Sequence, residues 1–130
     1  MVDESGSIGS QNFKLVKEFL SRLVGRLAID SGHTRVGLVK FATDVGAGFN
    51  LNTHSTTSAV QSAISSLTYS KGGTHTHKAL EHVRTSMLTA AAGDRRNVSN
   101  VVVVLTDGDS NYQKSTQVSL HCTLRAIITF

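Results

Sequence analysis

The stretch Val101-Val-Val-Val-Leu105-Thr106-Asp107-Gly108 decides the fold class of this chain. Its first five residues are apolar and mostly β-branched, which is typical of a strand buried on both faces of a parallel sheet. Polar residues begin where that strand ends, at Asp107. A strand buried in this way needs a covering layer on each face, so the rest of the sequence must supply two layers of helices.

Helical spacing appears first in the segment that follows Ser10. Its apolar residues recur three and four positions apart, at Phe13, Val16, Leu20, Leu23 and Leu27. We expect Ser10 to cap this helix and Gly32 to stop it. Further helices are predicted from Ser58, capped together with Gln61, and over residues 115–125. Another is predicted to carry Ala79, Leu80, Val83 and Met87 inward and to end at Gly93-Asp94.

A strand cut to its last residues is predicted at residues 1–3, and further strands are predicted over residues 34–42 and 46–51 and from residue 127 onward. The glycines of residues 46–51 favour a place at a sheet edge. Strands that alternate with helices predict an α/β fold, a doubly wound and mostly parallel sheet flanked by helices. We expect one domain over residues 1–130, incomplete at both ends because each end falls within a predicted strand.

Composition excludes several classes of protein. The 130 residues are 39% hydrophobic and 17% charged, as in a soluble globular domain. No apolar run is long enough to span a bilayer. A net charge of +4 with seven aromatic residues and no Trp gives little support for nucleic-acid binding. One cysteine excludes an internal disulfide, and the sequence shows no signal peptide.

Three polar turns follow or precede these elements on the same expected edge of the sheet. They are Asp3-x-Ser5-x-Ser7, the turn at Thr74, and Asp107-Gly108-Asp109-Ser110. Their carboxylates and hydroxyls are hard oxygen ligands, suited to Mg²⁺, Mn²⁺ or Ca²⁺. Ordinary turns whose Asp and Ser satisfy backbone groups explain the same residues equally well.

A resemblance to a known family favours the metal site. The sequence resembles a von Willebrand factor type A domain, the module of integrin inserted domains, matrilins and collagen VI. The resemblance rests on segments in the family's order: residues 2–9, 35–42, Phe49 to Leu51 with Leu67 to Tyr69, residues 72–76 with Ala79-Leu80, and residues 101–108.

The resemblance implies a metal-ion-dependent adhesion site. Its ligands would be Asp3, Ser5, Ser7, Thr74 and Asp107. It further implies Mg²⁺ (or Mn²⁺ or Ca²⁺) as the ion and an extracellular location. The expected partner is a matrix or cell-surface protein, collagen-like among others, that contributes a Glu or Asp to the metal. We expect neither nucleic-acid binding nor membrane insertion.

Other residues flank this predicted site. A ligand rim is predicted from Glu4, His75, Asp109, Ser110 and Tyr112. For Glu4, a carboxylate that is solvated or that pairs with a nearby base is favoured over an acceptor behind the metal ligands. A zinc site at His75, His77 and His82 is less favoured than ordinary surface histidines. Asn97-Val98-Ser99 is an N-glycosylation motif if the chain is secreted.

Two other functions remain as alternatives to adhesion. An intracellular A domain that serves as an assembly scaffold fits the lack of a signal peptide. A divalent-metal enzyme is less favoured, because Gly72-Gly73-Thr74 lacks the lysine of a phosphate-binding loop. We predict that the chain is not an enzyme.

Overall fold

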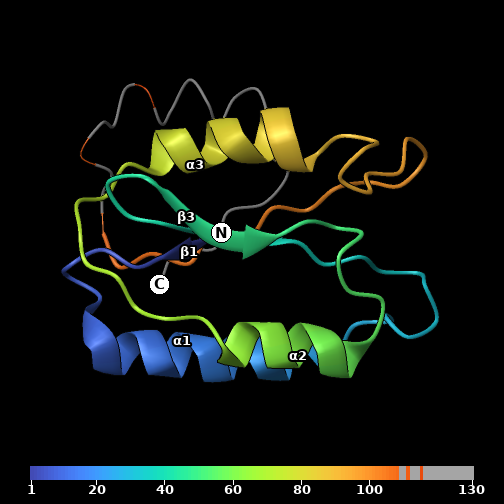
Figure 1. Ribbon diagram of the computed structural model, residues 1–130, viewed down its shortest axis with the longest axis horizontal. Helices are drawn as coiled ribbons and strands as arrows, with labels where there is room; N and C mark the ends of the chain where they lie inside the picture. The colour runs from blue at the N-terminus through green and yellow to red at the C-terminus, as the bar shows by residue number, and fades with distance from the viewer. Residues whose placement is uncertain (109–110, 112–114, 116–130) are drawn as a thin grey trace.

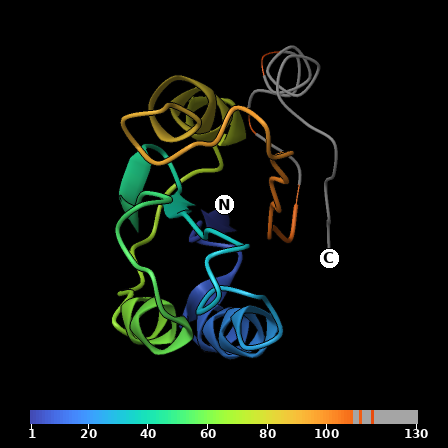
Figure 2. The ribbon, with the colours of Figure 1, turned by 90° about the vertical axis from the view of Figure 1, so that its right-hand side faces the viewer.

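The computed structural model describes residues 1–108, 111 and 115 of the chain. It places a sheet between two layers of helices (Figures 1 and 2). Helices α1 (Gly9–Val24) and α2 (Thr57–Ser65) cover one face. Helix α3 (Thr76–His82), continued by the π-helical turn η1 (Val83–Met87), covers the other. This layered arrangement confirms the predicted α/β class.

The sheet contains β1 (Val2–Asp3), β2 (Leu38–Phe41) and β3 (Val45–Phe49), in that order. β1 is parallel to β2, and β3 is antiparallel to β2. Within the described residues β3 lies at an edge of this sheet, as its glycines predicted. The helix predicted over residues 115–125 and the strand predicted from Ile127 lie outside the described part, apart from Ser115.

The apolar stretch before Asp107 lies on the other side of β1. Leu105 forms a parallel bridge with Val2, its N–H donates to the Met1 carbonyl, and its carbonyl accepts the Asp3 N–H. Residues 101–104 are not in a regular strand, and Val101 is 67% exposed. The prediction of a strand buried along its whole length is therefore wrong. The described contacts of this stretch with the N-terminal segment are at Leu105 and at Val103, whose carbonyl accepts from the Met1 nitrogen at 2.7 Å.

Helix α1 differs from its prediction at both ends. It begins at Gly9, Ile8 holds the capping position without a side-chain hydrogen bond, and Ser10 lies inside the helix. It ends at Val24, after which the N–H groups of Arg26 and Leu27 bond to carbonyls three residues back, at Leu23 and Val24, in a tightened last turn. Gly32, the predicted stop, lies in the following loop with φ of 76°.

The cap of helix α2 (Thr57–Ser65) lies two residues before the predicted one. Thr56 is the cap, and its hydroxyl accepts the N–H of Ala59 at 3.2 Å. Asp30 supports the same end, because its carboxylate accepts both the N–H and the hydroxyl of Thr57. These hydrogen bonds lower the pKa of Asp30. Ser58, the predicted cap, lies within the helix.

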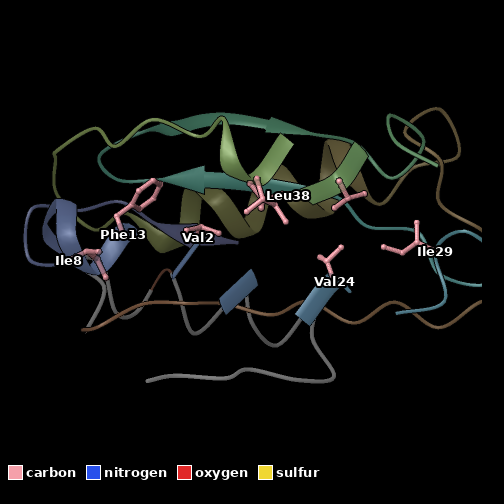
Figure 3. Packing of buried hydrophobic residues seen from close by; sticks show 8 residues of the cluster. Val2, Ile8, Phe13, Val24, Ile29 and Leu38 are labelled. Carbon is pink, nitrogen blue, oxygen red and sulfur yellow. The ribbon is translucent and has the colours of Figure 1, made fainter. Parts of the chain in front are cut away.

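Two apolar clusters hold the layers together. The first fills the space between the sheet and the α1–α2 layer (Figure 3), and consists of Val2, Ile8, Phe13, Val24, Ile29, Leu38, Val60 and Ile64. The second packs around α3 and η1, and consists of Val39, Phe41, Ala79, Val83, Met87, Val102 and Val104. The alternating contacts of β2, with Leu38 on one side and Val39 and Phe41 on the other, show that both faces of the sheet are buried.

No helix in the described part of the chain is long and apolar enough to cross a membrane.

Candidate metal centre

The first and last of the three polar turns meet at one edge of the sheet. β1 ends at Asp3, and the parallel stretch beside it ends at Leu105. Parallel neighbours bring their carboxyl ends to the same edge, which is where open α/β sheets place their sites. The loop after Asp3 and the turn at Asp107 therefore lie together, at the left of Figure 1.

A chain of hydrogen bonds joins the oxygen atoms of these two turns. The Oγ atoms of Ser5 and Ser7 are 3.1 Å apart. The Ser7 hydroxyl donates to Oδ1 of Asp107 at 3.0 Å. Ser5 is buried, whereas Ser7 and Asp107 are exposed. The site is thus anchored in the interior at one end and open to solvent at the other.

Asp3 lies on the interior side of these hydrogen bonds, and it is 1% exposed. Its Oδ1 accepts the N–H of Ser5 at 2.7 Å, and its Oδ2 accepts the hydroxyl of Thr106 at 2.6 Å. Each oxygen therefore already has one donor. Asp3 orders the loop that follows it, and its remaining lone pairs are what it can offer to an ion or to a water molecule.

The turn that carries Thr74 is tied to the same loop through its backbone. The carbonyl of Gly72 accepts the N–H of Gly6 at 3.0 Å. Thr74 follows two residues later and is half-buried. Asn111 fixes its backbone, because Asn111 Oδ1 accepts the Thr74 N–H at 2.5 Å and the Asn111 N–H donates to the Thr74 carbonyl at 2.9 Å.

The predicted rim is only partly described. Glu4 is 3% exposed, and its Oε2 accepts from Lys40 Nζ at 2.8 Å and from the Ser70 N–H at 2.9 Å. It is therefore an interior residue paired with a base, and the prediction of a rim position is wrong for it. His75 is half-buried, and its N–H donates to the Ala42 carbonyl. Asp109, Ser110 and Tyr112 lie outside the described residues.

Three further residues hold the site in place, and sequence reasoning missed two of them, Thr106 and Asn111. Thr106 donates to Asp3, and Asn111 holds the Thr74 backbone, as described above. Tyr69 packs on Phe13 with ring centroids 5.5 Å apart, and its hydroxyl donates to the Ser5 carbonyl at 3.0 Å. Thr106 lies beside a predicted ligand and could have been found from its position, but Asn111 carries no such signal. Tyr69 was expected either to flank the rim or to pack half-buried, and it is half-buried.

The neighbouring histidines form a pair of tilted rings rather than a ligand cluster. The ring centroids of His75 and His77 lie 5.8 Å apart. Burial lowers the pKa of His77, and the adjacent charges of His75 and Lys78 lower it further. Among the described residues, no group of three His, Cys, Asp or Glu side chains is placed to hold a metal.

The oxygen spacing is a test of whether a hard cation fits this arrangement. Mg²⁺ binds oxygens at about 2.1 Å in an octahedron, so neighbouring ligand oxygens lie about 3 Å apart. The two measured separations, Ser5 to Ser7 and Ser7 to Asp107, are 3.1 and 3.0 Å. These oxygens are therefore spaced as adjacent ligands of Mg²⁺ would be, and the site contains no nitrogen or sulfur donor among the predicted ligands.

The fold and these turns define a class of protein, a Rossmann-like α/β domain with an oxygen-lined site at the carboxyl edge of its sheet. The chain belongs to the von Willebrand factor type A domain family, whose sequence profile matches residues 1–130. The resemblance seen in the sequence is thereby confirmed.

Matrix proteins are prominent among the relatives. The chain is 43% identical over 113 residues to the collagen alpha-4(VI) chain of Mus musculus, covering 85% of this chain and 5% of that protein. It is 39% identical over 113 residues to matrilin-4 of Homo sapiens, covering 85% of this chain and 18% of that protein. The chain therefore spans only a small part of these relatives, which are extracellular-matrix structural proteins and not enzymes.

Solved structures of a mussel byssus protein share the fold. Proximal thread matrix protein 1 matches with a TM-score of 0.87 at 26% identity, over 98% of this chain and 36% of that one. Another structure of the same protein, described as having a zinc-occupied MIDAS motif, matches with a TM-score of 0.83 at 25% identity, over the same 98% and 36%. A divalent metal is thus compatible with this fold.

Proposed function

We propose that this chain is a divalent-cation-dependent protein-binding module, a metal-ion-dependent adhesion domain. Asp3, Ser5, Ser7, Thr74 and Asp107 would hold Mg²⁺, with Mn²⁺ or Ca²⁺ as substitutes. The observation that carries the proposal is the run of oxygens from Ser5 through Ser7 to Asp107, at separations of 3.1 and 3.0 Å. It begins in the interior and ends at the surface, where a partner can reach it.

The charge of the donor set explains why an acidic partner is expected. Three of the five proposed ligands are neutral hydroxyls, and the carboxylate of Asp3 already accepts two hydrogen bonds. The two carboxylates formally match a divalent charge, but if one of them acts through a water molecule the ion stays electrophilic. A bound cation would therefore attract a further hard, negative oxygen, and a Glu or Asp side chain of a partner protein supplies one.

The relatives indicate the kind of partner. Collagen chains and matrilins are matrix proteins, so we propose that the partner is a matrix or cell-surface protein, with collagen-like strands as one candidate. The same relatives favour a location outside the cell over an intracellular scaffold. We propose no catalytic residue, because the relatives are structural proteins.

Binding to a panel of immobilised collagens and matrilins tests this function. We expect at least one of them to capture the chain in millimolar Mg²⁺, and we expect EDTA to abolish capture and added Mg²⁺ to restore it. Ser7→Ala removes the hydroxyl in the middle of the oxygen run. It should weaken capture at least about 10-fold, because substitution of residues that support a metal site typically lowers metal affinity by that factor or more. Surface plasmon resonance measures both effects.

Ser10→Ala is the matched control for this experiment. Ser10 is an exposed serine three residues further along, inside α1. Its replacement should leave capture unchanged. Capture that persists undiminished in EDTA, or that falls equally in both variants, would contradict a function through the metal site.

A further inference from the structure

The sequence contains one N-glycosylation motif, at Asn97-Val98-Ser99. Of the asparagines in the chain, only Asn97 is followed two positions later by Ser or Thr. We propose that Asn97 is the acceptor of an N-linked oligosaccharide that covers exposed valines. These lie at the end of the sheet opposite the metal-site loops, which are the turns that contain residues 3–7, Thr74 and Asp107. The proposal requires passage through the secretory pathway, which the matrix relatives favour.

All three residues of the motif are exposed to solvent. Within the described part of the chain, the Asn97 side chain makes no hydrogen bond that a sugar would have to displace. Val98, the middle residue, is 43% exposed. A glycosylating enzyme can therefore reach the Asn97 amide and the Ser99 hydroxyl from outside without disturbing the core.

Hydrogen bonds to other parts of the chain fix the loop around the motif, and Asn97 stays at the surface. The N–H of Val98 donates to the Arg95 carbonyl at 3.0 Å, so the chain turns here. The Arg95 guanidinium donates to the carbonyls of Gly32 and His33 at 3.0 and 2.7 Å. Asn100 Nδ2 closes the loop by donating to Asp94 at 2.9 Å.

Exposed valines in and beside this loop form an apolar surface that an oligosaccharide on Asn97 could cover. Four large hydrophobic residues are strongly exposed among the described residues, and two of them, Val98 at 43% and Val101 at 67%, lie within four positions of Asn97. Exposed apolar patches favour aggregation, and an N-linked glycan is bulky and solubilising. An oligosaccharide at Asn97 would shield these valines from other molecules.

The position of the motif leaves the metal-site loops free. The stretch from Val101 to Leu105 separates the two places, with Asn97 before it and Asp107 after it. In Figure 1 the orange loop that contains residues 94–100 lies at the right-hand end, whereas the blue loop after β1 lies at the left. A glycan on Asn97 would therefore project from the end that does not face the proposed ligand.

The covalent step is an ordinary glycosyl transfer. Nδ2 of Asn97 forms a bond to the anomeric carbon of a lipid pyrophosphate-linked oligosaccharide. The bond from that carbon to the pyrophosphate oxygen breaks, and the lipid pyrophosphate leaves with the electron pair. The amide gives one proton to a base of the transferring enzyme.

Secretion of the full chain from mammalian cells behind an added leader tests the proposal. Digestion of the wild type with a peptide N-glycosidase should lower its mass by that of one oligosaccharide. Asn97→Gln and Ser99→Ala should both be secreted at the digested mass, whereas Ser99→Thr should retain the glycan. Asn12→Gln, an exposed asparagine outside any motif, should also retain it.

A wild-type chain without a glycosidase-sensitive mass would overturn the proposal, whether it is secreted or retained in the secretory compartments. Light scattering should show more aggregation for Asn97→Gln than for Asn12→Gln, and equal aggregation would contradict the shielding role. Wild type and Asn97→Gln should give the same metal-induced rise in melting temperature. A failure of both to respond would count against the metal site alone, so the two proposals fail separately.

Discussion

Lys40→Met is expected to lower the free energy of unfolding by about 3–5 kcal/mol, the cost of leaving one member of a buried ion pair alone. Lys40 Nζ lies 2.8 Å from Oε2 of Glu4, and the two side chains are 3% and 4% exposed. Lys40 also donates to the Thr68 carbonyl. Without it, the Glu4 carboxylate stays buried with the Ser70 N–H as its remaining donor in the described structure. Urea unfolding measures the loss.

Adding Glu4→Gln to that variant should return part of the lost stability. The glutamine side chain is neutral, and its oxygen can still accept the Ser70 N–H. The double variant should therefore unfold with a higher free energy than Lys40→Met alone, and the double-mutant cycle isolates the coupling between the two side chains. Lys14→Met, at an exposed lysine of α1, is the control and should change little. A loss in Lys40→Met no larger than in Lys14→Met would contradict the buried pair.

Gly48→Ala is expected to destabilise the fold by about 3 kcal/mol or more, at the upper end of the cost of overpacking. A Cβ atom on Gly48 would overlap the Leu38 carbonyl oxygen and would lie 2.9 Å from the Val39 Cα. Both are backbone atoms of β2, the strand with which Gly48 pairs. Because backbone cannot rotate away as a side chain can, relief requires separation of β3 from β2.

Gly25→Ala is the matched control for the strand variant. Gly25 has α-helical backbone angles, and the atoms nearest to an added Cβ lie at 3.4 Å or beyond. The substitution should leave stability within about 1 kcal/mol of the wild type, because alanine fits that conformation. Thermal melts followed by circular dichroism compare the two. Equal melting temperatures for Gly48→Ala and Gly25→Ala would show that the close approach of β3 to β2 is absent in solution.

Local patterns in the sequence predicted the layers of the fold well. The helical spacing from Phe13 to Leu20 located α1, because one apolar stripe is enough to define a helix that covers a sheet. The ends of the helices were less predictable. Gly25 rather than Gly32 follows the last residue of α1, and Thr56 rather than Ser58 caps α2. Several residues near each end could serve as caps, and tertiary contacts determine which one does.

The strand before Asp107 shows a different limit. Its β-branched residues indicate burial, and Val102, Val104 and Leu105 are buried. Whether residues pair in a ladder depends on the strand beside them, which no local pattern reveals. Leu105 pairs with Val2, whereas Val101 lies outside any regular strand and is exposed.

The candidate site was predicted from spacing for the residues that lie directly after strands. Asp3, Ser5, Ser7 and Asp107 lie together as expected, although metal binding by them remains a proposal. The position of Glu4 could not be predicted from sequence, because no local pattern shows which side of the segment its side chain faces. Only the structure shows that it faces the interior, where Lys40 pairs with it. The supports from Tyr69 and Asn111 depend on contacts 64 and 37 residues apart in sequence.

Thermal unfolding of the chain in Mg²⁺ and in EDTA tests the metal site most directly. A cation that binds only the folded state must stabilise it, and at 100 times its dissociation constant the gain is about 2.7 kcal/mol. We expect a cooperative melt that Mg²⁺ shifts upward in the wild type and in Ser10→Ala, and a shift that is lost in Ser7→Ala. A cooperative wild-type melt at the same temperature in Mg²⁺ and in EDTA would contradict the metal centre and the function proposed from it.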